Sequence, residues 1–152
     1  MGLFNAETFS EQEQKTAFEQ YKLYVEMANK ISERRGSANT FFTTLNTVLF
    51  TITAIIRSRE MLWVAFTCGI GCVISFAWYI TLNSYRKLNS GKFAVINEIE
   101  KRLPLSGFSY EWEVLTSGTK KSDYMPISHS EKIVPALFFI AYLAMAIILC
   151  FF

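Results

Sequence analysis

Few residues in this chain could do chemistry, and none of them has the spacing that a known reaction needs. Ser90-Gly91-Lys92 matches the end of a phosphate-binding loop, but the upstream glycine is missing and no predicted strand precedes it. Glu98 and Glu100 would project from different sides of a helix, so they cannot serve together as general acid and base. These residues predict neither a nucleotide site nor a catalytic carboxylate pair.

The single histidine and the three cysteines do not form a catalytic or metal-binding set either. His129 stands beside a predicted helix start, where Ser128 and Ser130 are better explained as helix caps than as nucleophiles. Two of the cysteines are four residues apart, but two thiols alone do not complete a tetrahedral metal site. We predict that the cysteines are small packing residues and that the protein has no catalytic activity, cofactor or metal. These cysteines are Cys68, Cys72 and Cys150.

Three apolar stretches dominate the chain, and any functional residues must be positioned by them. They cover residues 38–56, 61–82 and 133–152, and they contain none of the 15 Lys and Arg residues. Each has roughly twenty residues, which as a helix spans about 30 Å, the thickness of the hydrocarbon layer of a membrane. Because backbone polar groups in lipid must bond within their own segment, each stretch is predicted to be helical. The absence of charges inside them argues against a proton relay or a coupled transporter.

The distribution of basic residues predicts how the chain is oriented in the membrane. Thirteen Lys and Arg residues lie in 1–37 and 83–132, whereas the turn between the first two spans contains only Arg57 and Arg59. Loops rich in Lys and Arg stay in the cytoplasm, so we place the N-terminus and the 83–132 loop there and the C-terminus outside. No cleavable signal peptide is expected, and the net charge of +2 gives no signal for nucleic acid binding.

The N-terminal segment, 1–37, is predicted to be an amphipathic cytoplasmic helix. Ser10 and Glu13 have the spacing of a capping box at its start. Phe18, Tyr21 and Val25 recur on one face, and charges of both signs occupy the others. The helix could lie on the membrane surface, pack on the 83–132 loop or join copies of itself. The mixed charges favour packing against protein, and Gly36 is expected to loosen its junction with the first span.

The first span has an unusually polar face, which consists of Asn39, Thr43, Asn46, Thr47 and Thr51. A lone Asn in lipid is costly, so this face is expected to contact other helices or to line a water-filled lumen. The threonine hydroxyls could instead bond back to the carbonyl four residues earlier. That alternative does not account for the asparagine near the middle of the span. We favour contacts with another helix and treat the face as an oligomer or lumen surface.

The second span carries residues that favour close helix packing, and aromatic and basic residues flank the spans. Small residues let helix backbones approach closely in lipid, and the span carries Ala65, Gly69, Gly71, Cys72 and Ser75. We assign the packing role to Ala65, Gly69 and Cys72. Aromatic and basic side chains near the span ends are typical of interfacial anchors. The predicted anchors are Trp63, Trp78, Tyr79, Arg34 and Arg35.

The 83–132 loop is predicted to contain a helix that continues out of the second span. An apolar face recurs up to Leu103, and Pro104 and Gly107 end the helix. Residues 108–115 alternate between apolar and polar types, which favours a short extended segment. The fold predicted from these elements is an all-α membrane protein with three transmembrane helices.

Several runs of residues resemble the RipA-type family of small octameric bacterial membrane proteins. The resemblance covers most of the chain from Tyr21 to Leu143 and rests on Tyr21-Lys22-Leu23-Tyr24, Ser32-Glu33-Arg34-Arg35, Trp78-Tyr79, Tyr85-Arg86-Lys87-Leu88-Asn89, Lys92-Phe93-Ala94-Val95-Ile96, Leu103-Pro104 and Tyr110-Glu111-Trp112. It implies a ring of eight subunits in the bacterial inner membrane, with the soluble parts in the cytoplasm. A weaker likeness is to SLATT-type proteins, which are thought to act by perturbing membranes.

The ring that the resemblance implies constrains the function. Helix axes about 9 Å apart would give eight central helices a bore roughly 16 Å wide, which is an unselective leak if filled with water. We therefore expect a lipid-filled or plugged centre. The function we expect is a non-enzymatic membrane-organising or scaffold assembly whose partners are its own copies and membrane lipids. The alternative is a gated channel or membrane-permeabilising effector of a stress or phage-defence type.

Overall fold

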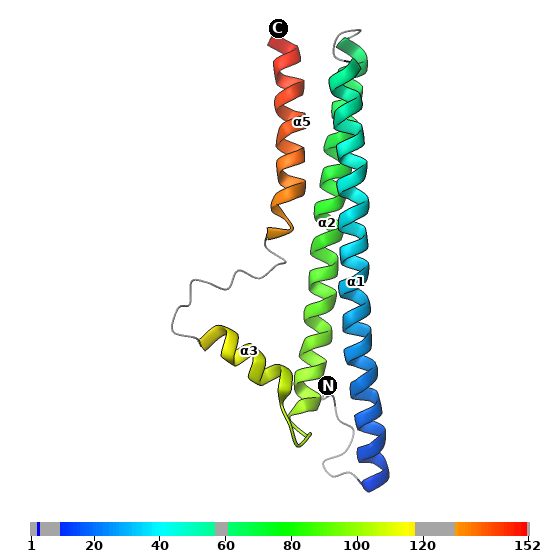
Figure 1. Ribbon diagram of the computed structural model, residues 1–152, viewed down its shortest axis with the longest axis vertical. Coiled ribbons are helices and arrows are strands. Elements are labelled where there is room, and N and C mark those ends of the chain that lie inside the picture. The colour runs from blue at the N-terminus through cyan, green and yellow to red at the C-terminus, as the bar shows by residue number, and fades with distance from the viewer. Residues whose placement is uncertain (1–2, 4–9, 57–60, 118–129, 152) are drawn as a thin grey trace. The chain divides into compact units, whose positions relative to one another are not determined.

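The computed structural model describes residues 3, 10–56, 61–117 and 130–151, and these residues are almost entirely helical. Four helices follow one another in the described chain (Figure 1). They are α1 (Glu11–Ile56), α2 (Met61–Glu100), α3 (Gly107–Ser117) and α5 (Ile133–Phe151). The predictions on Ser128, His129 and the 57–60 turn lie outside the described residues. The all-α class predicted from the sequence is confirmed.

The two long helices each combine a predicted span with a predicted soluble helix. The start of α1 is fixed by the expected capping box, because the backbone N–H of Ser10 donates to Glu13 Oε2 over 2.8 Å. Gly36 was expected to loosen the junction with the first span, but α1 continues through it without a break. A single glycine inside a helix costs only about 1 kcal/mol, which a 46-residue helix tolerates. As predicted, α2 continues well beyond the second apolar stretch.

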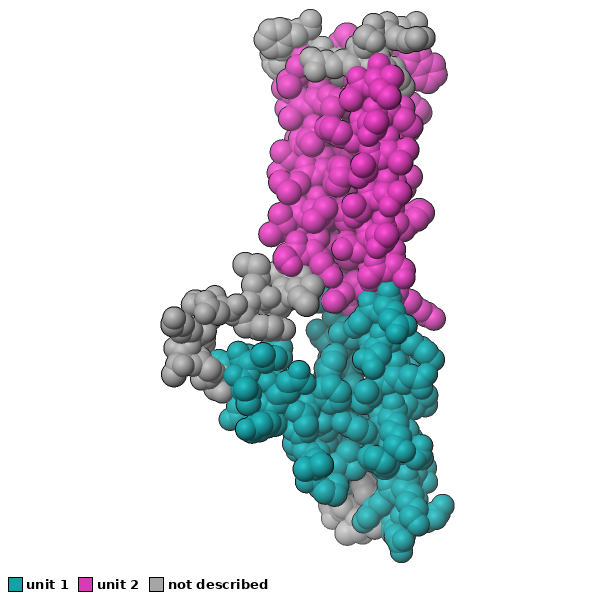
Figure 2. Space-filling view, in the orientation of Figure 1, with its two compact units in different colours: residues 1–33, 86–125 teal, residues 34–85, 126–152 magenta. Residues whose placement is uncertain are grey.

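The chain divides into two compact units, which Figure 2 shows in different colours. Unit 1 comprises Met1–Glu33 and Arg86–Met125, and unit 2 comprises Arg34–Tyr85 and Pro126–Phe152. Helices α1 and α2 therefore each contribute to both units. Among the described helices, α1 and α2 are long and apolar enough to cross a membrane, and the apolar part of α5, Ile133–Ile148, is shorter.

Unit 2 is a three-helix arrangement whose directions follow from its contacts. Asn39 bonds to Trp78 and Asn46 bonds to Ser75, so α1 and α2 run antiparallel. Arg35 pairs with Glu131 and Asn46 bonds to Tyr142, and both contacts join residues 96 apart in sequence. Because this offset stays constant, α5 runs parallel to α1. Its core is formed by Val64, Cys68, Tyr142, Leu49, Phe50, Cys72, Phe138, Met145 and Ala146.

Unit 1 packs the N-terminal part of α1 against the C-terminal part of α2. The buried apolar residues are Ala28 and Ile31 of α1 and Ile96 and Ile99 of α2. After Glu100 the chain turns through Pro104, which has no N–H to continue the helix, and α3 begins at Gly107. The prediction of an extended segment at 108–115 was wrong. A strand needs a partner strand to bond its backbone, whereas a helix bonds internally, and a capped start stabilises it here.

Candidate functional site

Asn46, the residue that most clearly needed a partner, is fully buried inside unit 2. The hydroxyl of Ser75 donates to Asn46 Oδ1 over 3.0 Å, and Asn46 Nδ2 donates to the carbonyl of Phe42 over 2.9 Å. The hydroxyl of Tyr142 donates to the backbone carbonyl of Asn46 over 3.0 Å. This site therefore joins α1, α2 and α5 within one protomer. The side chain of Asn46 is used inside the subunit rather than on its surface.

Asn39 is likewise bonded to α2 of the same subunit. Trp78 donates its indole N–H to Asn39 Oδ1 over 3.1 Å, and its ring stacks on Phe42 with centroids 6.0 Å apart. Trp78 was expected to be an interfacial anchor, but it is completely buried in the protomer. The reason is that its single polar group already has a partner in the interior, so it gains nothing by reaching lipid headgroups.

The threonines of the predicted polar face bond to their own helix. The hydroxyls of Thr43, Thr47 and Thr51 donate to carbonyls four residues earlier, over 2.8, 2.8 and 2.9 Å. Thr47 and Thr51 are exposed on the protomer, whereas Thr43 is half-buried. The predicted face is therefore divided. Its asparagines contact α2, and its threonines lie toward or on the outer surface with their hydroxyls already bonded.

The small residues of the second span are divided in the same way. Ala65 and Gly69 are exposed, whereas Cys72 packs partly against the unit 2 core. The close approach that small residues permit is found instead at Gly71, where an added Cβ would overlap the ring of Tyr142. A tyrosine in the middle of an apolar segment is the sequence signal for such a site, because its hydroxyl needs a partner inside the bundle.

The other predicted anchors lie near the ends of the apolar segments. Trp63 and Tyr79 are exposed. Lys132 Nζ lies 2.8 Å from Asn83 Oδ1 and 5.6 Å from the centre of the Tyr79 ring. Arg35 forms a 3.3 Å ion pair with Glu131, and both side chains are largely covered. Arg34 is exposed. The start of α5 is thus held to α1 by an ion pair and to α2 by a hydrogen bond.

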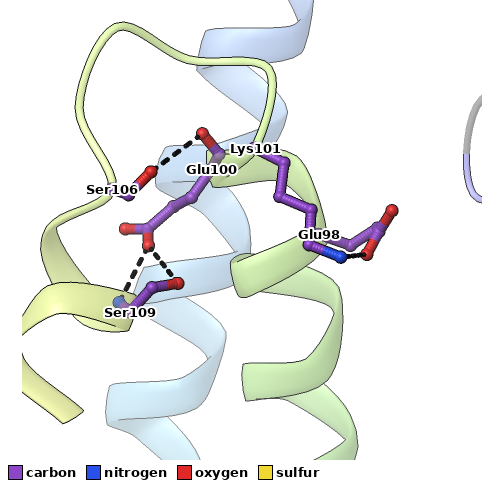
Figure 3. A network of polar contacts seen from close by, with 5 residues as sticks. All are labelled: Glu98, Glu100, Lys101, Ser106 and Ser109. Carbon is purple, nitrogen blue, oxygen red and sulfur yellow. Dashed lines mark hydrogen bonds and ion pairs between the residues drawn. The ribbon is translucent and has the colours of Figure 1, made fainter. Parts of the chain in front are cut away.

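Unit 1 contains a buried carboxylate that the sequence did not reveal. Glu100 is the last residue of α2, and its side chain receives the first turn of α3 (Figure 3). The N–H groups of Phe108 and Ser109 donate to Glu100 Oε1 and Oε2 over 3.0 and 3.1 Å. The Ser109 hydroxyl adds a bond of 3.2 Å, and the Tyr21 hydroxyl adds one of 2.9 Å from α1. Glu100 therefore acts as a cap for α3 supplied from another helix.

The bonds around Glu100 shift the pKa of both partners. Burial alone would raise the pKa of Glu100, but together the donors on Phe108, Ser109 and Tyr21 lower it below its ordinary value of 4.5. Burial, followed by the bond to Glu100 and its negative charge, raises the pKa of Tyr21 to about 12. At neutral pH the pair is therefore a carboxylate and a phenol. Such a pair connects helices and holds a charge in place.

The class of protein follows from these elements. Long apolar helices, polar groups bonded within the bundle and a glycine at a close helix approach define an all-helical membrane protein. The model of the octameric membrane protein family (8xMP) matches residues 18–151, and the chain belongs to that family. This confirms the predicted resemblance to a family of small octameric membrane proteins. No curated protein and no solved structure matches the chain.

Proposed function

We propose that the protein is a non-enzymatic scaffold of eight identical subunits in the bacterial inner membrane. The name of its family supports eight copies, and the apolar segments of α1, α2 and α5 support three crossings. In this proposal the N-terminus and the 83–132 loop face the cytoplasm, and the C-terminus lies outside. The assembly organises the surrounding lipid, and its subunits are held together by their membrane helices and by unit 1.

One observation carries the choice of a scaffold over an open pore. In the membrane part of α1, the polar side chains of Asn39, Asn46 and Thr47 are bonded within the subunit. They therefore do not need water. The exposed side of this segment also presents large apolar side chains, namely Phe41, Leu45, Val48, Ile52 and Ile55. Such a surface suits lipid or another helix, and it would be costly as the wall of a wetted channel.

The experiment that tests the scaffold is the native mass of the purified protein together with its conductance in planar bilayers. We expect a mass of eight subunits and no current above that of protein-free bilayers. Thr47→Leu should leave both results unchanged, because the Thr47 hydroxyl bonds only to its own helix in the subunit. A steady ion current from the wild-type octamer would contradict the scaffold.

A gated channel is the second candidate, and a stripe of threonines favours it. Thr40, Thr44, Thr47 and Thr51 are all exposed, and their spacing places them along one side of α1. If this stripe lined a lumen, a stimulus would produce current in wild-type octamers. Replacing Thr44 and Thr51 by leucine would then reduce that current, whereas the same change at Val73, an exposed residue of α2, would not. Equal currents in the two variants would remove the support that the stripe gives to a channel.

The proposed orientation has its own test. A reporter that is active only outside the cytoplasm should work when it is fused after Phe152. The same reporter should fail when it replaces residues 1–9 or is inserted in 118–129. Activity of the 118–129 insertion would reverse the orientation without affecting the argument for eight copies.

A further inference from the structure

Helix α3 leaves most of its surface exposed in the protomer. From Tyr110 to Thr116 every side chain is exposed. The exposed fractions include 68% for Tyr110, 56% for Trp112 and 41% for Leu115. In a monomeric protein, aromatic residues at this density on one short helix would be costly, and such surfaces mark sites of interaction.

The apolar residues of α3 form a stripe that begins inside the subunit. Phe108, Trp112 and Leu115 recur at helical spacing on one side of the helix. Phe108 packs edge-on against Phe93 of α2, with ring centroids 5.6 Å apart. The two later members of the stripe are exposed. The stripe therefore begins at a contact inside the subunit and ends on its surface. This indicates that another surface covers the exposed end in the assembly.

A complementary surface lies on the exposed side of α2 in the same unit. Lys87, Ser90, Gly91 and Ala94 are all exposed and share one face, and we call them the α2 shelf. A Cβ added at Gly91 would meet nothing within 4 Å, so the shelf is shallow and free of bulk. Small residues of this kind accept the large side chains of an approaching helix.

Charge complements the shapes of the two surfaces. Helix α3 carries Glu111 and Glu113 and no basic residue, and Glu111 flanks the apolar stripe. The shelf carries Lys87, and within the described part of the chain no ion pair of Lys87 is found. Opposite charges at the edge of an apolar contact fix its register more than they strengthen it.

The subunit holds the start of its own α3 away from the centre of its own shelf. Glu100 and Phe93 hold the first turn of α3 beside their side of α2. Measured around the helix from Phe93, Ser90 lies about 60° away, Ala94 about 100°, Lys87 about 120° and Gly91 about 160°. The centre of the shelf is therefore turned away from the subunit's own α3 and is open to the α3 of a second copy.

We infer that α3 of each subunit docks the exposed end of its stripe, Trp112 and Leu115, on the α2 shelf of a neighbouring subunit, with Glu111 beside Lys87. This inference rests on the proposed octamer, because a monomer would offer no second shelf. In this inference α3 forms the contact between the soluble parts of neighbouring subunits, and the membrane helices form separate contacts.

Cross-linking between two distinguishable copies tests the docking. Full-length Leu115→Cys with one tag is co-expressed with full-length Ala94→Cys carrying another tag, and purified membranes are treated with a short bismaleimide. We expect a cross-linked dimer that carries both tags. Tyr110→Cys replaces Leu115→Cys as the matched control, because Tyr110 is also exposed but lies on the other side of α3. Chains with only the natural cysteines give the background.

A charge exchange tests the pairing of Glu111 with Lys87 and uses the same cross-link as its readout. Glu111→Lys and Lys87→Glu should each lower the mixed-tag product about threefold, and the double exchange should restore it. Glu113→Lys should have little effect, because residue 113 lies about 160° around the helix from residue 111. Rescue by the double exchange cannot result from misfolding.

The possible outcomes separate this inference from the proposal on which it rests. If the wild type has the mass of eight subunits but gives no mixed-tag product, the docking is wrong and the octamer stands. A mass below eight would contradict the octamer itself. A cross-link only within one chain would show that the subunit covers its own α3. A blue shift of Trp112 fluorescence on anionic vesicles in place of cross-linking would show that lipid covers it. Both of these last results overturn the inference.

Discussion

The hydroxyl of Tyr21 lies 2.9 Å from Glu100 Oε1, and this bond joins residues 79 apart in sequence. The same carboxylate receives the first turn of α3 through two backbone N–H groups. Glu100 therefore connects the N-terminal part of α1, the end of α2 and the start of α3. Within unit 1, the position of α3 depends on this one side chain more than on apolar packing, since Phe108 and Ser109 are the only half-buried residues in 107–116.

Replacing Glu100 by alanine should free α3 from its cap. The N–H groups of Phe108 and Ser109 would lose their acceptor, and unfolding in detergent should become easier by about 2 kcal/mol. Tyr21→Phe removes one bond only and should cost about 1 kcal/mol. Denaturant titration measures both effects. If Glu100→Ala cost no more than Glu98→Ala, a change at a half-buried residue of the same helix, Glu100 would not have the role assigned to it.

Acid should weaken this cap. The pKa of Glu100 is lower in the folded protein than its ordinary value of 4.5, so its contribution to stability is complete above pH 4.5. That contribution is lost as the pH falls through the folded-state pKa. The difference in unfolding free energy between wild type and Glu100→Gln should therefore stay constant above pH 4.5 and shrink below it. A difference that grew at lower pH would contradict the assignment of a carboxylate bonded in its charged form.

Alkali should act on the other partner. Because the pKa of Tyr21 is raised to about 12, its contribution is complete below the ordinary pKa of 10 and is lost as the pH rises through about 12. Ultraviolet titration of Tyr21→Phe should lack one of the late-ionising phenols that the wild type shows. In Glu100→Gln the same phenol should ionise at lower pH. Identical titration curves for wild type and Glu100→Gln would contradict the pairing.

Two glycines of α2 provide a matched pair for testing the approach of α5. At Gly71 an added methyl group would overlap the ring of Tyr142, whereas at Gly69 it would meet nothing within 4 Å. Gly71→Ala should destabilise unit 2 by about 1–3 kcal/mol, and Gly69→Ala should be neutral or slightly stabilising because alanine favours helix. Unfolding in detergent compares the two. Truncating Tyr142 to alanine should remove most of the difference between them.

The Asn46–Ser75 bond should appear as a coupling between two substitutions. The two substitutions, Asn46→Leu and Ser75→Ala, are made singly and together, and unfolding in detergent is measured for each. We expect a coupling free energy of about 0.6 kcal/mol and at most about 1.7, which is the range for hydrogen bonds between membrane helices. Thr47 is the control partner, because its hydroxyl bonds back to the carbonyl of Thr43. A coupling of Ser75 to Thr47 as large as that to Asn46 would argue against the bond.

Helices α1, α2 and α5 could be predicted from the sequence, because hydrophobic length, capping residues and the Pro104 turn are local signals. The polar face of α1 was also recognisable from the cost of asparagine in lipid. How that face divides could not be predicted. Asn39 and Asn46 lie on the same side as Thr43, and only the position of α2 decides that the asparagines turn inward.

The partners of Trp78 and Glu100 could not be predicted from local sequence, and neither could the helix at 108–115. Trp78 has the position of an interfacial residue in the sequence, but a hydrogen-bond partner on α1 draws it inside. From the sequence, Glu100 could only be excluded from an acid–base pair with Glu98. The burial of Glu100 depends on the turn that places Phe108 and Ser109 beside its carboxylate. No local sequence pattern indicates that this turn brings the chain back to Glu100. The alternating pattern at 108–115 predicted a strand because alternation does not reveal whether a partner strand exists.

The carboxylate of Glu100 also imposes an order on biosynthesis. Tyr21 leaves the ribosome 79 residues before Glu100, and Ser109 follows nine residues after it. The charge therefore cannot find all its donors until the nascent chain has passed both apolar segments of the hairpin and reached α3. Completion of unit 1 is thus coupled to the prior synthesis of the apolar segments of α1 and α2.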